Sequence, residues 1–241
     1  AFGDEILQVL LACAPKIVSF HFGLPSAQAV DALKRAGVKL IGNATNVAEA
    51  SVLEAGGMDA IVAQGAEAGG HRGAFIGAPH ENDMGTMALV PLVVDAVGVP
   101  VIAAGGIFDG RGVAAAMMLG ASGAQIGSAF LRAPESSAHA LHKQALAETP
   151  DNTTKLTRVF TGRPARSIRN RLVHELSANE GDAAPFPTQR AVTAPLAKAA
   201  GDRGSADFMP LWSGQAGSRA EAAPSAQIYK RICDEALALL G

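Results

Sequence analysis

A repeated unit constrains the fold of this chain more than any other feature: a short apolar segment, a turn, and a segment with helical periodicity. Short apolar runs bounded by glycine or proline are typical of strands that are buried on both faces. We expect such strands at residues 17–20, 39–43, 59–64, 99–104 and 124–126. Their alternation with helices favours right-handed β/α units and a parallel sheet.

Residues with strong capping preferences mark the helices between these strands. Ser26 precedes one periodic segment and can cap its N-terminus. Gly37 follows the same segment, at the position where helices commonly end in a residue of left-handed conformation. Thr45 or Asn46 caps the next helix, and Thr86 begins another. The expected helices cover residues 4–14, 26–35, 45–55, 86–96 and 109–119.

The strand count selects between two architectures. A closed β/α barrel needs eight parallel strands, whereas the pattern predicts five. The chain therefore forms either an open sheet or part of a TIM-type (β/α)8 barrel. We favour the barrel, with about the first three β/α units absent from this chain. Residues 1–133 are then the C-terminal portion of the barrel.

The pattern changes after residue 133 to polar, proline-punctuated segments with helical periodicity. We expect helices at 136–148, 168–176, 189–202 and 226–240, and no further strand. Residues 134–225 are interpreted as a mainly helical extension that covers the active-site face. Residues 226–241 are interpreted as a terminal helix that packs on the barrel.

Composition narrows the class of partner. The chain has 241 residues, of which 49% are hydrophobic, and 20 basic against 22 acidic residues give a net charge of −2. This balance argues against nucleic acid and anionic membranes, and favours a small molecule. Cys13 and Cys233 have no metal spacing and are expected in the core. Without a signal-like or membrane-spanning stretch, the sequence predicts a soluble, cytoplasmic protein.

The segment Met58–Gly73 has the layout of a catalytic loop. Its apolar strand ends in a glycine-rich turn that carries His71 and Arg72. The pKa of a histidine lies near working pH, so His71 is a candidate base or anion-binding donor. Arg72 is either an attractor of an anionic substrate or a solvated or ion-paired side chain.

Three glycine turns at successive strand ends indicate a phosphate site. Glycine lets the backbone approach an anion closely, and a following helix N-terminus adds positive potential. Two of these turns, Gly105-Gly106 and Gly127-Ser128, would take the usual phosphate position of a barrel. Gln64 and Gln125 end apolar strands and suit the orientation of a heteroaromatic ligand.

Other polar residues receive less specific interpretations. His21 follows a strand and is expected in the same pocket, and Asp109 is expected to cap a helix. Trp212 is expected to pack the extension onto the barrel mouth. The basic stretch 162–171 lacks interleaved aromatic residues, so we expect it to pair with the protein's own surface. The remaining histidines are expected on the surface: His80, His139, His142 and His174.

Together these segments resemble the nitronate monooxygenase family, formerly called 2-nitropropane dioxygenases. The resemblance covers nearly the whole chain, and its motifs are specific only in combination. They are the runs 64–73, 104–107 and 125–131, with 162–166 and 210–215 in the C-terminal part.

The resemblance implies an oxidoreductase that binds FMN and uses O2 to oxidise alkyl nitronates to carbonyl compounds and nitrite. The family's catalytic histidine matches His71. Its flavin contacts match Gln64, Gly69, Gly70, Gly105, Gly106, Gln125, Ile126, Gly127 and Ser128. No metal is implied. The segment lacking at the front carries further flavin contacts, so a separate N-terminal segment is an expected partner.

Two alternatives stay open. The core 67–71 is also similar to FMN-dependent reductases that use NAD(P)H, of the enoyl-acyl carrier protein or quinone type. A non-catalytic flavin-binding fragment is the other alternative.

Overall fold

The computed structural model describes residues 2–77 and 83–241, so His80 lies outside the described residues. The chain divides into two compact units. The first contains the described residues of Ala1–Ala66, Gly73–Ala104 and Ala116–Gln125. The second contains Glu67–Arg72, Gly105–Ala115 and Ile126–Gly241. Each unit is described below by itself.

The first unit is built on a five-stranded parallel sheet in the order β1-β2-β3-β5-β6. The strands are β1 (Ile17–Phe20), β2 (Lys39–Ala44), β3 (Ala60–Gln64), β5 (Val101–Ala104) and β6 (Gly123–Gln125). All five were predicted, with ends that differ by at most two residues. The α/β class and the parallel sheet are therefore confirmed.

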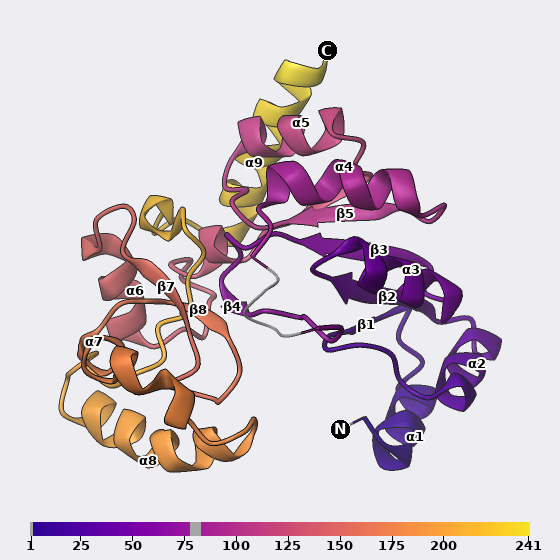
Figure 1. Cartoon of the computed structure of the whole chain (residues 1–241). Helices are drawn as coiled ribbons and strands as arrows, with labels where there is room; N and C mark the ends of the chain where they lie inside the picture. The colour runs from indigo at the N-terminus through magenta and orange to yellow at the C-terminus, as the bar shows by residue number, and fades with distance from the viewer. Residues whose placement is uncertain (1, 78–82) are drawn as a thin grey trace. The chain divides into compact units, whose positions relative to one another are not determined.

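Four helices follow or precede these strands. They are α1 (Asp4–Cys13), α2 (Ala27–Arg35), α3 (Val47–Ala55) and α4 (Thr86–Ala96). Ser26 caps α2 through its side chain, and Asn46, not Thr45, caps α3. Helix α3 contacts β2 and β3, while α4 contacts β3 and β5, as Figure 1 shows.

The core of the first unit lies between this sheet and its helices. Its fully buried aliphatic side chains come from both layers, as expected when amphipathic helices cover apolar strands. They are Leu33, Leu40, Leu53, Ile61, Leu89 and Val90. The same packing brings the ends of β2 and β3 side by side, which positions their terminal polar residues.

The second unit holds a three-stranded antiparallel sheet, in the order β4-β8-β7. The strands are β4 (Gly70–His71), β7 (Thr154–Thr157) and β8 (Ala165–Ile168). The expectation of no further strand after residue 133 was wrong. Strand β8 is fully buried although it contains Arg166 and Ser167, because partners distant in sequence satisfy these polar groups.

Helical segments make up most of the rest of the second unit. They are α5 (Gly110–Met118), η1 (Ser128–Phe130), α6 (Ala140–Glu148), α7 (Arg171–Leu176), η2 (Ser177–Asp182), α8 (Thr188–Asp202), η3 (Gly217–Arg219) and α9 (Ser225–Leu240). The C-terminal end of α5 belongs to the first unit. Ile228 and Ile232 of α9 pack in one apolar cluster with Phe108, Ala129 and Ala133.

Both cysteine assignments were wrong. Cys13 is exposed near the end of α1, and Cys233 is only half-buried on α9. The buried side chains of these two helices are others: Leu7 of α1, and Ile228, Ile232 and Ala236 of α9. Among residues 2–77 and 83–241, no helix is long and apolar enough to cross a membrane.

Candidate functional site

His71 lies on a short strand of the second unit. It pairs with Ala165 of β8, and the next amide, Arg72 N–H, donates to Pro164 O at 2.9 Å. The imidazole is half-buried, with its Nε2 atom 2.9 Å from Oγ1 of Thr161. Strand pairing thus fixes the backbone of His71, and Thr161 fixes one ring nitrogen.

Two aromatic rings hold the imidazole from other directions. The Trp212 ring centroid lies 5.5 Å from that of His71 at 46°, and the Phe186 centroid lies 5.6 Å away at 72°. Phe160 meets Trp212 edge-on at 5.4 Å. The only tryptophan therefore packs against the candidate catalytic histidine and a small apolar cluster of the second unit.

The surroundings of Thr161 indicate the tautomer of His71. The Thr161 hydroxyl donates to Arg163 O at 3.2 Å. On this basis we assign the tautomer in which the hydroxyl oxygen accepts from Nε2–H of His71. In the neutral ring the lone pair then lies on Nδ1, which is the basic atom.

His142 was expected on the surface and is buried instead. Its Nε2 atom lies 3.0 Å from the backbone carbonyl of Trp212. Burial lowers the pKa of His142, opposed by the hydrogen bond to Trp212. The sequence missed this role because the partner lies seventy residues away. His139 and His174 are exposed, as expected.

Four segments of the second unit meet around glycines. A Cβ on Gly69 would lie 2.5 Å from Gly214 N and 2.7 Å from Ser213 C, so only glycine allows this approach. The Gly214 amide donates to Ser128 Oγ at 2.9 Å. Gln215 N donates to Glu67 O, and a Cβ on Gly106 would lie 3.5 Å from the Glu67 side chain. Turns 67–69, 105–106, 127–128 and 213–215 are therefore neighbours.

These turns leave backbone groups open to an anion. Gly69, Gly106 and Gly127 are exposed. Gly105 and Gly106 have φ of +110° and +70°, a conformation that glycine adopts without strain. Within the described residues, the N–H groups of Gly106 and Gly127 donate no hydrogen bond. Amides of exposed glycines on neighbouring turns are donors of the kind that hold phosphate.

The start of helix α5 is capped by a carboxylate. Asp109 accepts from the amides of Arg111 and Gly112 at 3.1 and 3.4 Å, which confirms its predicted capping role. A carboxylate thus already accepts from two amides at this helix N-terminus, which leaves fewer of them for a phosphate.

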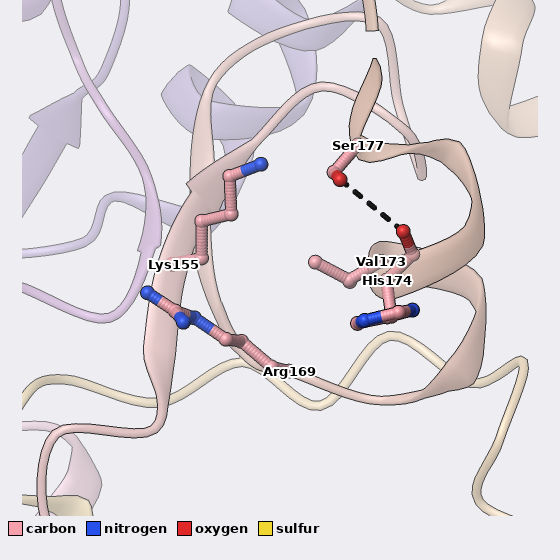
Figure 2. A pocket seen from close by; sticks show the side chains of 5 residues that line it. All are labelled: Lys155, Arg169, Val173, His174 and Ser177. Carbon is pink, nitrogen blue, oxygen red and sulfur yellow. Dashed lines mark hydrogen bonds between the residues drawn. The ribbon is translucent and has the colours of Figure 1, made fainter. Parts of the chain in front are cut away.

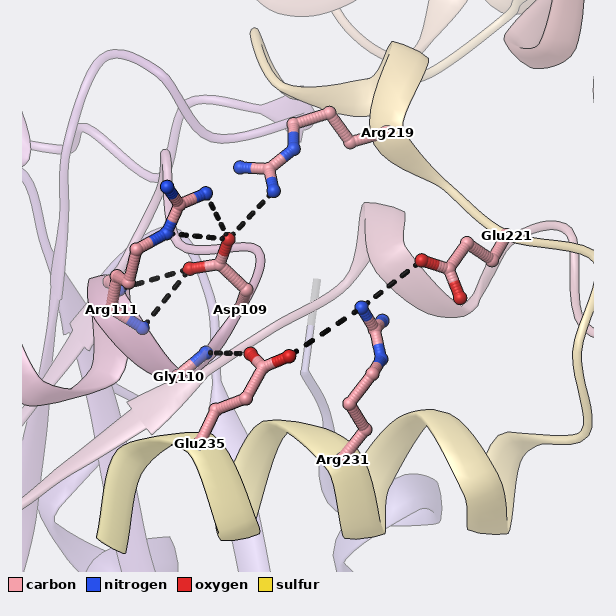
Figure 3. A network of polar contacts seen from close by, with 8 residues as sticks. Asp109, Gly110, Arg111, Arg219, Glu221, Arg231 and Glu235 are labelled. Carbon is pink, nitrogen blue, oxygen red and sulfur yellow. Dashed lines mark hydrogen bonds and ion pairs between the residues drawn. The ribbon is translucent and has the colours of Figure 1, made fainter. Parts of the chain in front are cut away.

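The same carboxylate organises a polar network (Figure 3). Asp109 accepts from Nη2 of both Arg111 and Arg219 at 2.7 Å. Arg111 and Arg219 hold the pKa of Asp109 well below its usual range, although burial opposes the shift. Glu235 of α9 accepts from Gly110 N at 2.9 Å. This network fastens α9 and η3 to the turn that follows Gly106.

The first unit carries a second group of predicted residues. Gln64 is buried, and its Oε1 accepts from Gly73 N at 2.8 Å and from Asn43 Nδ2 at 3.5 Å. A Cβ on Gly73 would collide with Asn43 and would lie 2.9 Å from Cε1 of His21. His21 therefore lies beside this group, and its exposed ring contacts Phe22.

Asn43 was missed, although it carries the signal that identified Gln64. Both are polar residues near the carboxyl end of an apolar strand. Gln125 has the same position on β6 and is exposed, while Ile126 packs against the cluster around Phe108. Arg72 is fully buried, which rules out a solvated side chain.

The basic stretch 162–171 is mostly structural. Arg166 is buried and donates to Thr154 Oγ1 at 3.2 Å. Arg171 pairs with Glu175 at 2.6 Å, so the expectation of internal pairing is confirmed for that residue. Arg169 is exposed.

Comparison with known proteins assigns the family. A model of the family described as nitronate monooxygenase matches residues 3–235. The chain belongs to the nitronate monooxygenase family. It is 46% identical over 220 residues to a probable nitronate monooxygenase of Staphylococcus aureus strain Newman. That alignment covers 91% of this chain and 62% of the relative, so the chain spans less than two thirds of the relative's length.

Solved structures of similar proteins support the α/β fold. Nitroalkane oxidase from Streptomyces ansochromogenes matches at a TM-score of 0.93 and 40% identity, over 99% of this chain and 70% of that one. FabK from Thermotoga maritima matches at a TM-score of 0.82 and 30% identity, over 98% and 73%. This family member therefore shares its fold with part of each of these longer chains.

Proposed function

We propose that this chain forms part of an FMN-dependent enzyme that oxidises alkyl nitronates, and also nitroalkanes, with O2 to carbonyl compounds and nitrite. Family membership and the likeness to a nitroalkane oxidase support this assignment. The observation that carries it is the meeting of four glycine turns in the unit that also holds His71.

The donor set of the second unit fits the phosphate of FMN. Exposed amides of Gly106 and Gly127 supply donors, and the Ser128 hydroxyl adds another while its oxygen accepts from Gly214. The resemblance assigns further flavin contacts to the residues predicted above: Gln64, Gly69, Gly70, Gly105, Gln125 and Ile126. When bound, FMN supplies the electron acceptor for the substrate and the centre that reacts with O2.

His71 is the residue proposed to handle the substrate proton. With Nε2–H directed to Thr161, Nδ1 accepts a proton from the carbon beside a nitro group. For a nitronate, which has already lost that proton, the protonated ring donates a hydrogen bond to a nitro oxygen. Trp212 and Phe186 restrict the ring's rotation and partly exclude water from it.

The sheet of the first unit supports a finer fold proposal. Among the described strands, β1 pairs only with β2, and β6 pairs only with β5. We propose that the five strands belong to a (β/α)8 barrel whose three other strands come from chain outside these 241 residues. Residues 1–133 then belong to the barrel, 134–225 to an extension over its active-site face, and 226–241 to a helix on its wall.

Replacing His71 with Asn tests the assignment. In protein purified with the segment that completes the barrel, we expect nitroalkane turnover to fall by about a hundredfold or more, with flavin still bound. Oxygen consumption and nitrite release measure the turnover, and flavin absorbance measures occupancy. Unchanged turnover at full occupancy would contradict the role of His71.

A flavin-dependent reductase is the second candidate, supported by the similarity of residues 67–71 to such enzymes. Anaerobic stopped-flow mixing with NADH or NADPH separates the two functions. Rapid bleaching of the flavin would favour the reductase. Slow bleaching together with nitrite production from nitronates would favour the oxidase. A colourless complete protein would favour a fragment without catalytic function.

A further inference from the structure

A cavity of about 280 Å³ lies in the second unit, away from the residues assigned above to flavin or nitronate. It is lined by Lys155, Arg169, Val173, His174 and Ser177. Figure 2 shows the side chains of Lys155 and Arg169 on one side and α7 with Val173 and His174 on the other. Three of its five lining residues carry nitrogen donors.

Strand register places the two cations on one face of the β7–β8 ladder. Lys155 lies opposite Ser167. The ladder continues one residue further, because Arg169 N donates to Thr153 O at 2.9 Å. Side chains two residues apart share a face of a strand, so Arg169 lies on the face of Ser167 and Lys155.

Lys155 and Arg169 both keep N–H donors that a ligand in the cavity could use. Lys155 Nζ lies 2.9 Å from Glu180 Oε1, and Glu180 also accepts from Thr157 Oγ1 and Arg158 N at 3.0 and 3.3 Å. An ammonium group has three N–H donors, so two remain on Lys155. Within the described residues, the Arg169 guanidinium makes no hydrogen bond or ion pair.

The charge of Arg169 acts on its neighbourhood. Burial lowers the pKa of Arg166, Glu67 raises it, and the positive charge of Arg169 lowers it further. Glu180 forms an ion pair with one lining cation, Lys155, whereas Arg169 adds a second positive charge at the cavity. The local balance is positive, which favours an anion.

Apart from the His174 imidazole, the remaining lining is aliphatic or already engaged. The methylene stems of Lys155 and Arg169 present apolar surface beside Val173, which is itself buried (Figure 2). Ser177 Oγ donates to the carbonyl of His174 at 3.2 Å, so the hydroxyl proton is not free for a ligand. The cavity thus combines cationic donors at its rim with an apolar wall.

We propose that this cavity binds a small organic anion in which one carboxylate is joined to a short aliphatic chain. The planar guanidinium of Arg169 matches a carboxylate with two parallel hydrogen bonds, and Lys155 adds a point charge. The methylene stems of Lys155 and Arg169 pack against the aliphatic part. A cavity of about 280 Å³ lies just below the usual range of ligand pockets, about 300–1,000 Å³, which suits a small compound.

Titration of the full chain with butyrate, followed by NMR of arginine and lysine side chains, tests the proposal. We expect saturable shifts at Arg169 and Lys155, and none with the uncharged analogue butyramide. Arg169→Gln should weaken butyrate binding by about tenfold or more, because the bidentate partner is lost. Arg169→Lys should give an intermediate loss.

Arg190→Gln is the matched control, because Arg190 is an exposed arginine of the same unit that does not line the cavity. It should leave butyrate affinity unchanged. Equal weakening by both Gln variants, or shifts away from the cavity, would overturn the proposal. So would binding of inorganic phosphate without binding of butyrate, since the apolar wall would then have no role. Circular dichroism of each variant verifies that it folds.

Discussion

The Nε2 atom of His71 lies 2.9 Å from the Oγ1 atom of Thr161, although ninety residues separate them in the chain. The contact depends on the antiparallel sheet, because β4 places His71 opposite Ala165 and Thr161 stands just before β8. In the tautomer assigned above, the hydroxyl proton is engaged by Arg163 O and the hydroxyl oxygen accepts from Nε2–H of His71. We propose that Thr161 is a positioning residue that selects this tautomer.

Thr161→Val keeps the shape of the side chain and removes the hydroxyl. We expect nitroalkane turnover to fall by about tenfold, because the proton of His71 is no longer held on Nε2. Long-range ¹H–¹⁵N spectra should show the His71 tautomers mixing. Flavin occupancy should not change.

Thr161→Ser is the control, since it retains the hydroxyl. It should preserve the tautomer and most of the turnover. If Thr161→Val lowers turnover while the spectrum of His71 stays that of the Nε2–H form, the positioning role is wrong and the effect is only structural.

The sequence predicted the part of this site that depends on local pattern. The strand ending at Gln64 and the turns at Gly105-Gly106 and Gly127-Ser128 lie where an apolar run meets glycines. Local pattern also found Asp109 as a helix cap. These features are short-range, so the residues that determine them are adjacent in the chain.

The sequence did not predict contacts that cross long stretches of chain. Strand β8 contains Arg166 and Ser167, whose burial depends on partners outside the strand such as Thr154 and the Leu211 amide. His142 has the pattern of an exposed helical residue in the sequence, and its burial depends on a contact with the distant Trp212 carbonyl. Asn43 is a different case, because its position at a strand end was visible and was not used.

Alanine substitutions at two glycines of the predicted site, Gly127 and Gly69, should separate an effect on flavin affinity from an effect on folding stability. A Cβ on Gly127 meets no atom within 4 Å, and its φ of −110° suits any residue. Gly127→Ala should therefore leave the urea midpoint unchanged. Flavin affinity, measured by fluorescence titration of the complete protein, should fall by about tenfold as the methyl group blocks the amide.

Gly69→Ala is the contrasting variant, because its Cβ would lie 2.5 Å from Gly214 N. Backbone must move, so the free energy of unfolding should fall by about 2 kcal/mol. Unaltered flavin affinity in Gly127→Ala would remove Gly127 from the proposed site.

His142 should make stability depend on pH. Its pKa in the folded state is lowered by burial, so the unfolded chain binds more protons below the ordinary histidine pKa of about 6.5. The stabilising contribution is complete above that pKa and is lost as pH falls. The slope can reach about 1.4 kcal/mol per pH unit.

His142→Gln retains an N–H donor for the Trp212 carbonyl and removes the titration. Urea unfolding between pH 8 and 5, a range of about one and a half units on either side of the ordinary pKa, should show a flatter curve for this variant than for the parent. His174→Gln, at an exposed position, should not flatten it. Parallel curves for the parent and His142→Gln would show that the buried imidazole does not titrate on unfolding.

Glu49 is a buried carboxylate that ties the segment after Arg72 to helix α3. Its Oε2 accepts from Thr45 N and Oγ1 at 2.6 and 2.8 Å, and its Oε1 accepts from Phe75 N and Ile76 N at 2.6 and 2.9 Å. Glutamine has one acceptor oxygen, so Glu49→Gln leaves two donors facing an NH2 group. The free energy of unfolding should fall by about 2–4 kcal/mol, and the Phe75 and Ile76 amides should exchange faster with solvent.

Glu54→Gln is the control, because it loses no more than the exposed contact to Gly98 N. It should lower the free energy of unfolding by about 1 kcal/mol or less. Similar losses in the two variants would mean that the four bonds of Glu49 do not act together.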